Sequence, residues 1–440
     1  MRLRALVLAT CLLAAPLAPL ASAAPAYSGD PVAEGVGKDL RPVAHITYKS
    51  GTDLEFATVK GRDYAVAPSE SSAEGGLRLI DITKPERPKL TGFLPCAVTQ
   101  NDVQVRGTIV LMGVDGGVKS DVCFEQLDRK PSLGLFVISI ANPAKPRAIG
   151  FVPVPYGVHN STWHPGGRYV YTSDSELTPK SSEQAGAMGG RVQIIDLANL
   201  RKPKLIRELP LPANVLSSHD ITFNKAGTRA YLAAISTTLI ADTTDPANPK
   251  IITTIVDPTI NISHGADPTP DGKYLLVTDE QAGAAANGVC NVGGVHVFDI
   301  SVELAPVKVG FYSFDPTNSI ADTTNSGNLT CTAHVLDYAA NGKTWSNAGY
   351  SAGVRIVSAT SLLVRPTELA YFTPNDADTW SAKTYKNPRY LFANDLNRGF
   401  DVYRWEPGAG AIRTTRPGAP TVFRGPTTFR AGSYCFTAGR

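Results

Sequence analysis

One segment of this sequence recurs from residue 77 towards the C-terminus, and this repetition constrains the fold more than any other feature. The first copy, at 77–95, reads LRLIDITKPERPKLTGFLP. Further copies begin at Leu135, Val192, Thr238, Val295 and Val354, with a degenerate copy, FDVYRW, from Phe400. Aligned on the residue that ends the apolar run, the copies follow at steps of 58, 57, 46, 57, 59 and 46 residues. Such a period indicates an array of supersecondary units.

Each copy predicts half of a four-stranded unit. An apolar run ending in Asp or Ser is followed, seven or eight residues later, by proline, which predicts a strand, a tight turn and a second strand. The segments before these runs, such as HNSTWHPGGRYVYTSD and HDITFNKAGTRAYLAA, predict two further strands joined by a glycine-containing turn. Four short antiparallel strands repeated seven times predict an all-β, seven-bladed β-propeller.

The two ends of the repeat array complement each other. The segment 42–50 (PVAHITYKS) looks like an outer strand without a blade, whereas the last unit lacks an outer strand after Trp405. We therefore expect the N-terminal strand, which contains His45, to complete the seventh blade and close the ring. The expected division is a signal peptide over 1–23, the propeller over 24–406 and a Gly/Pro/Arg-rich tail over 407–440.

The repeats resemble those of the bacterial LVIVD-repeat proteins, relatives of the YVTN-type and other secreted propellers, from Asp53 to Trp405. The resemblance implies a seven-bladed propeller outside the cytoplasm. It assigns no activity, because propellers serve as binding proteins and as enzymes.

The start of the chain predicts export. Arg2 and Arg4 precede an apolar run that ends at Leu20, and Ala21-Ser22-Ala23 is a typical cleavage site. No later stretch reaches the ~18 apolar residues of a membrane-spanning helix. A formal net charge of +3 and the lack of a basic run argue against nucleic acid as a partner. The expected location is secreted or at the cell surface.

The cysteines that follow the signal peptide agree with an oxidising compartment. Cys96 and Cys331 lie just ahead of a repeat's first strand, whereas Cys123 and Cys290 lie in loops after its second strand. We expect disulfides between Cys96 and Cys123 and between Cys290 and Cys331, with Cys435 left over. The sequence contains no CxxC motif, so it gives no indication of a redox role.

The unusual polar residues gather on one face of the predicted ring. A histidine stands at the start of four inner strands, and the same alignment puts Glu55 and Asn101 there in the first two blades. The histidines are His159, His219, His264 and His334. The loops between second and third strands share this face, and four of them begin with Asp115, Asp174, Asp279 and Asp395. Three of these loops are long, which is typical of functional loops.

Two hypotheses account for the histidines. Imidazoles from four blades that converge at the channel mouth would bind copper, iron or zinc. Alternatively, a residue repeated once per blade ties loops to neighbouring strands and satisfies buried backbone groups. The loop carboxylates, together with Glu280, are candidates for calcium ligands or solvated loop residues, and Asp174 and Asp279 are candidate proton-transfer groups.

Other polar residues have structural interpretations. Aspartates that end third strands are expected to cap turn amides: Asp81, Asp196, Asp242 and Asp299. His164 lies in a turn on the opposite face, and His296 alternates with valines as a packed strand residue.

The leading functional hypothesis is an exported binding or scaffold propeller that binds a small molecule, a peptide or a cell-surface polymer at the His/Asp face. The alternative is a metal-dependent enzyme, an oxidase or a lyase or hydrolase, with the four histidines as ligands. The two hypotheses differ in whether at least three histidine nitrogens converge on one point.

Overall fold

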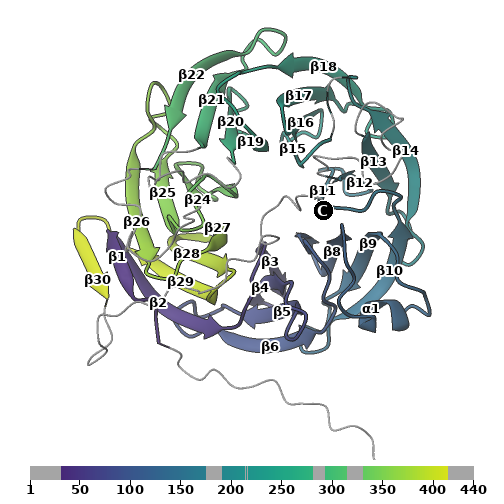
Figure 1. Cartoon of the computed structure of the whole chain (residues 1–440), viewed down its shortest axis with the longest axis horizontal. Helices are drawn as coiled ribbons and strands as arrows, with labels where there is room; N and C mark the ends of the chain where they lie inside the picture. The colour runs from purple at the N-terminus through teal and green to yellow at the C-terminus, as the bar shows by residue number, and fades with distance from the viewer. Residues whose placement is uncertain are drawn as a thin grey trace, which may run out of the picture.

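The chain folds into seven β-sheets arranged around a central axis (Figure 1). The computed structural model describes residues 31–174, 191–213, 215, 217–280, 293–314 and 331–414. Within these ranges one short helix occurs, α1 (Val122–Glu125), after the second strand of the second blade. The prediction of an all-β, seven-bladed propeller with four-stranded antiparallel blades is confirmed.

The first four blades follow one another in sequence, each with its inner strand first and its outer strand last. The first contains β3 (Glu55–Val59), β4 (Arg62–Ser69), β5 (Gly76–Asp81) and β6 (Lys89–Leu94). The second contains β7 (Val103–Arg106), β8 (Ile109–Val114), β9 (Gly134–Ser139) and β10 (Arg147–Pro153). The third contains β11 (Asn160–Trp163), β12 (Tyr169–Ser173), β13 (Arg191–Asp196) and β14 (Lys204–Pro210). The fourth contains β15 (Asp220–Phe223), β16 (Arg229–Ala234), β17 (Thr237–Asp242) and β18 (Lys250–Ile255).

The last three blades complete the ring. The fifth contains β19 (Ser263–Pro268), β20 (Tyr274–Asp279), β21 (Gly294–Asp299) and β22 (Val307–Tyr312). The sixth contains β23 (Leu336–Tyr338), β24 (Thr344–Ala348), β25 (Val354–Ser358) and β26 (Glu368–Pro374). The seventh contains β27 (Thr379–Tyr385), β28 (Asn387–Asp395), β29 (Gly399–Trp405) and, from the N-terminal part of the chain, β2 (Leu40–Thr47).

The repeated sequence segment corresponds to the third and fourth strands of the first six blades and, in its degenerate copy, to the third strand of the seventh. The first six third strands end at the residue on which the copies align, and β29 ends one residue later. The aspartates at these ends accept main-chain N–H groups two residues further on, at 2.8–3.0 Å, as Asp196 does from Ala198 and Asp242 from Thr244. The predicted turn caps are therefore confirmed.

The ring closes through the N-terminal strand, as expected. β2 pairs antiparallel with β29 from Leu40 opposite Trp405 to Thr47 opposite Gly399. His45 lies in this outer strand, where its Nδ1 is 3.0 Å from the carboxylate of Asp401. Because β2 occupies the open edge of β29, the last blade has the same four-stranded order as the others.

Two short strands widen the sixth blade, a feature that the sequence analysis does not predict. β1 (Gly35–Lys38) pairs with β26 on one side and with β30 (Ala411–Thr414) on the other. Both ends of the described chain therefore lie in one sheet, as Figure 1 shows in purple and yellow.

The hydrophobic core lies mainly between neighbouring blades rather than at the axis. Val137 of the second blade, for example, belongs to one buried cluster with Val170 and Ile195 of the third. Tight seams between blades also depend on glycine in the outer strands. A Cβ at Gly150 of β10 would lie 2.2 Å from the carbonyl oxygen of Leu200, which follows the third strand of the next blade.

One predicted disulfide is confirmed. Cys96 and Cys123 are bonded and fully buried, and they join the loop after β6 to helix α1 in the second blade. Cys290 and Cys435 lie outside the described residues, so the pairing of Cys290 with Cys331 stays a prediction. Residues 1–30, which include the predicted signal peptide, and 415–440 of the predicted tail also lie outside them. Within the described ranges, no helix has the length and apolar character needed to cross a membrane.

The seam at Gly150 yields a stability prediction. We expect Gly150→Ala to lower the free energy of unfolding by about 1–3 kcal/mol, because the added methyl group forces the third blade's loop outward. The matched control is Gly116→Ala, whose Cβ would meet its nearest atom at 3.6 Å and should change stability by about 0.5 kcal/mol or less. Urea unfolding followed by tryptophan fluorescence measures both, and equal effects would contradict this account of the seam.

Candidate functional site

The four predicted histidines meet at the axis of the ring. Each stands where an inner strand begins, and the main-chain N–H groups of His159, His219 and His334 donate to the second strand of their own blade. His264 is the second residue of β19. All four residues are buried, with at most 3% of their surface exposed. We call His159, His219, His264 and His334, together with Glu280, the His cluster.

The imidazole rings form a continuous row across four blades. Ring centroids are separated by 4.5 Å between His159 and His219, 4.1 Å between His219 and His264, and 4.2 Å between His264 and His334. The row ends against Trp380, whose ring centroid is 4.9 Å from that of His334. The structure thus brings together all four histidines proposed from the sequence.

Three of the rings are oriented by hydrogen bonds from Nδ1. His159 Nδ1 donates to Asp115 Oδ2 at 3.0 Å, and His219 Nδ1 donates to the carbonyl oxygen of His264 at 3.0 Å. His334 Nδ1 donates to the carbonyl oxygen of Trp380 at 2.5 Å. These bonds place the proton of each neutral ring on Nδ1 and leave the lone pair on Nε2.

The lone pairs of His159 and His219 face each other. Their Nε2 atoms are 3.1 Å apart, although each ring already donates its Nδ1 proton elsewhere. Two such lone pairs repel unless a proton or a metal ion lies between them. Two nitrogens bound to one zinc ion at the usual distance and tetrahedral angle lie roughly 3.3 Å apart. The approach of the two atoms therefore matches that of two ligands of one metal ion.

Glu280 supplies a carboxylate to the same cluster. Its Oε2 lies 3.8 Å from His264 Nε2, and its Oε1 lies 3.8 Å from His334 Nε2. Ligand atoms of His219, His264 and Glu280 all lie within 4.8 Å of one another. Burial raises the pKa of Glu280 to about 8, so without a cation the carboxyl group is largely protonated at neutral pH.

Burial also keeps three of the imidazoles neutral. It lowers the pKa of His334 to about 3. Burial and the neighbouring histidines together hold the pKa values of His219 and His264 well below their usual range. Neutral imidazole is the form that binds metal ions, so the protein does not have to remove protons from these rings before they act as ligands.

Tyr350 holds Glu280 in place. Its hydroxyl group donates to Glu280 Oε1 at 2.6 Å, and its ring centroid lies 4.7 Å from that of His334. Tyr350 has a φ of 49°, a left-handed conformation that is unfavourable for an aromatic residue. Reciprocal main-chain hydrogen bonds with Thr379 hold it there. The sequence analysis does not single out Tyr350, because it lies outside the repeated strands.

Three of the loop carboxylates named from the sequence act mainly on the connections that lead from one blade to the next. Asp174 accepts from the hydroxyl group of Ser217 at 2.5 Å. Asp279 Oδ1 accepts from the main-chain N–H groups of Asn261 and Ile262 at 3.0 and 2.9 Å. Asp395 accepts from the hydroxyl group of Thr379 and from several main-chain N–H groups. Asp115, by contrast, contacts the His cluster directly through His159.

The alignment of the first blade needs correction. The main-chain N–H group of Thr52, not that of Glu55, makes the hydrogen bond to the second strand that the histidines make elsewhere. The pair Thr52-Asp53 thus corresponds to His219-Asp220, and Glu55 lies three residues further on. Asn101 does hold the equivalent place in the second blade, and its Oδ1 accepts from Thr52 Oγ1 at 2.7 Å.

A second group of charged residues was missed by the sequence analysis. It lies on the inner strands or directly before them, one or three residues beyond the position of the histidines. We call it the axial belt: Asp53, Glu55, Asp102, Asp220, Asp267, Asp337 and Lys383. Their signal in the sequence is an acidic residue one or three places after the first residue of the segments TDLEF, NDVQV, HDITF, HGADP and HVLDY.

The other histidines have the structural roles expected of them. His164 Nε2 lies 2.8 Å from the carbonyl oxygen of Gly227, in the turns opposite the His cluster. His296 packs against Phe311 in the fifth blade with ring centroids 4.6 Å apart, and its Nε2 is 3.6 Å from Asp279 Oδ2.

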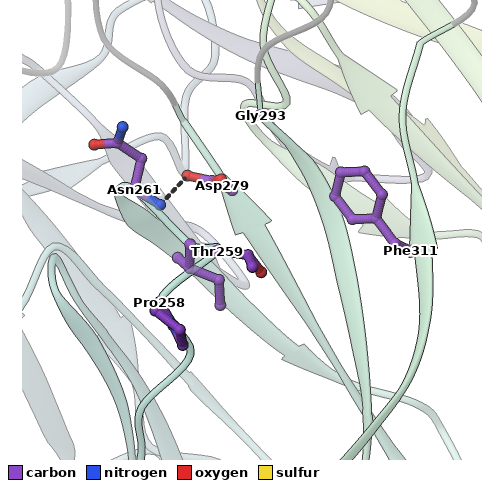
Figure 2. Close-up of a pocket in the computed structure, with 7 residues that line it drawn as sticks. Pro258, Thr259, Asn261, Asp279, Gly293 and Phe311 are labelled. Carbon is purple, nitrogen blue, oxygen red and sulfur yellow. Dashed lines mark hydrogen bonds between the residues drawn. The ribbon is translucent and has the colours of Figure 1, made fainter.

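A pocket of about 540 Å³ lies at the fifth blade near Asp279. Figure 2 shows Phe311 on one side of it and Pro258, Thr259 and Asn261 on the other. The remaining lining residues are Ile260 and Gly293. Its volume is in the range of small-molecule sites.

Solved structures with the same architecture include proteins of unrelated function. Hydrazine synthase from Kuenenia stuttgartiensis matches with a TM-score of 0.53 at 13% identity, over 84% of this chain and 98% of that one. The Cps50 (Swd1) β-propeller domain of Myceliophteria thermophila matches with 0.55 at 12%, over 83% and 99%. The periplasmic gluconolactonase PpgL of Pseudomonas aeruginosa matches with 0.55 at 10%, over 86% and 96%.

These similarities define the chain as a seven-bladed β-propeller and, at such low identity, show the fold alone. No protein-family model and no curated protein matches the chain. The resemblance to LVIVD-repeat proteins therefore stays an interpretation of the sequence.

The axial belt yields a prediction on pH. Burial and the charge of Glu55 raise the pKa of Asp337 to about 7, although the Lys383 ammonium group opposes this. The folded state thus holds a proton that the unfolded state releases near pH 4, and stability is lost as the pH rises from about 4 to about 7. We expect Asp337→Asn to lose less stability over this range than the unmodified protein. Urea unfolding at several pH values measures this, and parallel pH profiles would show that Asp337 is not perturbed.

Proposed function

We propose that this protein is an exported metal-dependent enzyme, which binds one transition-metal ion in the His cluster as its active site. The observation that carries the proposal is the 3.1 Å approach of two Nε2 atoms whose rings both donate from Nδ1. Histidine ligands of metals usually donate their second N–H to a carboxylate or a carbonyl oxygen, and His159, His219 and His334 all do so.

A comparison of the blades indicates that the fold does not require histidine at this position. Thr52 and Asn101 occupy the same position in the first two blades, and a single hydrogen bond of 2.7 Å joins them. Smaller polar residues therefore meet the hydrogen-bonding needs at the start of the inner strand in these two blades. Four adjacent imidazoles, two of which bring their Nε2 atoms to 3.1 Å from each other, exceed what that scaffold position needs.

The donor set favours copper, iron or zinc over calcium. Imidazole nitrogen suits transition metals, whereas calcium takes oxygen ligands. A bound ion of this kind would act as a Lewis acid or a redox centre. The residues around it have defined tasks: Asp115 orients His159, Tyr350 orients Glu280, and Trp380 covers the end of the row of imidazoles.

Export of the protein rests on two observations. The N-terminal sequence has the pattern of a signal peptide, and the buried Cys96–Cys123 disulfide suits an oxidising compartment.

The first test is elemental analysis of the mature protein, purified without an affinity His tag. We expect close to one transition-metal ion per chain, lost in the double variant His219→Ala/His264→Ala. Asp115→Asn should bind the ion about 10–100-fold more weakly, because His159 loses its orienting partner. Glu280→Gln should reduce the pH dependence of binding, because the ionisation of Glu280 then no longer accompanies metal uptake.

The matched control is His164→Ala, which removes a buried histidine on the opposite face and should retain the metal. Circular dichroism verifies that each variant is folded. A wild-type protein without transition metal, or a folded His219→Ala/His264→Ala variant that keeps it, contradicts the proposal.

Small-molecule binding is a second candidate function, favoured by the pocket beside Phe311 and Asp279. Its size suits a small molecule better than a peptide or a surface polymer. A fragment screen by ligand-observed NMR tests it. Binding that is lost in Phe311→Ala but kept in His219→Ala supports this function, and the lack of any such fragment opposes it.

A further inference from the structure

The axial belt is the most charged part of the interior. Its members come from the inner strands of six blades, which surround the axis in Figure 1. They comprise six carboxyl groups and one ammonium group. Lys383 Nζ lies 3.1 Å from Asp53 Oδ1 and 2.8 Å from Glu55 Oε1, so its charge is taken up by the first blade.

The charge of Lys383 also acts on the remaining acidic residues of the belt, but burial and the neighbouring carboxyl groups outweigh it. The charges of Asp53 and Asp220 act on Asp102, which, with burial, raises its pKa well above the usual value. In the same way burial and the charges of Asp220 and Asp337 raise the pKa of Asp267. These carboxyl groups come from different blades, whose inner strands surround the axis.

Asp102 gives an independent indication of a ligand. Its side chain is 94% buried, since 6% is exposed, yet its Oδ1 atom has no hydrogen-bond partner among the described residues. A buried carboxylate oxygen without a partner is costly. The neighbours that act on it electrostatically are the belt residues Asp53, Asp220 and Lys383, together with Asp115. This oxygen atom is therefore placed to accept a hydrogen bond from a ligand within the belt.

The spacing of the belt decides which cation fits. Among the described residues, the one set of three metal-ligand atoms within 4.8 Å is that of His219, His264 and Glu280. The belt carboxylates are therefore too far apart to enclose a dehydrated ion. They suit a divalent cation that keeps its water shell, whose water molecules donate hydrogen bonds to the carboxylate oxygens.

The belt also lies next to the His cluster on its accessible side. Asp220 directly follows His219, and Asp337 lies three residues after His334. Asp220, Asp267 and Asp337 are partly exposed, whereas the histidines are not. On the loop side, beyond the starts of the inner strands, the histidines adjoin a buried apolar cluster that includes Ile235, Ile262 and Leu396. An ion thus meets charged groups on one side of the cluster and apolar side chains on the other.

We propose that the axial belt binds hydrated divalent cations and delivers them to the His cluster. This inference rests on the proposed function, because it gives the route by which the metal site is filled. Fixed negative charge along a narrow path concentrates cations and raises their association rate, typically 10–10³-fold, in a manner that salt weakens. The belt accordingly controls the rate of metal loading rather than the identity of the ligands that hold the ion.

The test is the rate at which the metal-free protein takes up Co²⁺, whose visible absorption reports on nitrogen ligands. The variant is Asp102→Asn/Asp337→Asn, which removes two belt carboxyl groups without changing a residue of the His cluster. The matched control is Asp121→Asn/Asp128→Asn, which removes two exposed carboxylates beside α1. Each rate is measured with NaCl and with MgCl₂ at equal ionic strength.

We expect the belt variant to load Co²⁺ about tenfold more slowly than the unmodified protein and to reach the same final spectrum and stoichiometry. Mg²⁺, which competes for the oxygen-lined belt but not for imidazoles, should slow loading of the unmodified protein and of the control, and leave the belt variant almost unaffected. Unfolding midpoints verify that all three proteins are folded.

Two outcomes separate the inference from the function on which it rests. Equal loading rates and equal Mg²⁺ sensitivity in the belt variant and the unmodified protein would overturn the belt as a delivery site and leave the metal site standing. The absence of a Co²⁺ spectrum in every protein, including the control, would overturn the metal site and the inference with it.

Discussion

The pairing of β2 with β29 is the contact on which the rest of the molecule depends. It joins residues more than 350 positions apart in the sequence, from Leu40 opposite Trp405 to Thr47 opposite Gly399. Each blade packs its apolar residues against its neighbours, so an open ring leaves two such faces uncovered. Closure also fixes the angle between successive blades. The convergence of four histidines from four different blades is a direct result of that angle.

Burial gives the centre of the ring two different chemical environments within a few residues of chain. At the position of His219, water is excluded and the imidazoles are neutral. One and three residues further on, carboxyl groups are partly exposed and crowd one another, which raises their affinity for protons or cations. The inner strands therefore place nitrogen donors and oxygen donors in successive layers. A cation that passes from the second layer to the first exchanges water for imidazole.

Much of this structure can be predicted from the sequence, because the sequence repeats. The ends of the third strands, the aspartate turn caps, the closing strand and the four histidines are all periodic or adjacent to a periodic feature. Thr52 was missed because the alignment put Glu55, three residues further on, at that position. Glu280 was recognised as a residue that faces the site. Which of the neighbours Asp279 and Glu280 points towards the His cluster, however, depends on side-chain directions that the sequence does not show. Tyr350 and the axial belt become visible only when distant blades are brought face to face.

The side-by-side strands β1 and β30 determine how the ring is presented to its surroundings. The described chain begins and ends in the outer part of the sixth blade, and the hydroxyl group of Thr414 donates to the carbonyl oxygen of Ala33 at 2.5 Å. Both ends of the described chain therefore lie at the rim of the ring, at the far edge of a blade from the axis where the four histidines meet.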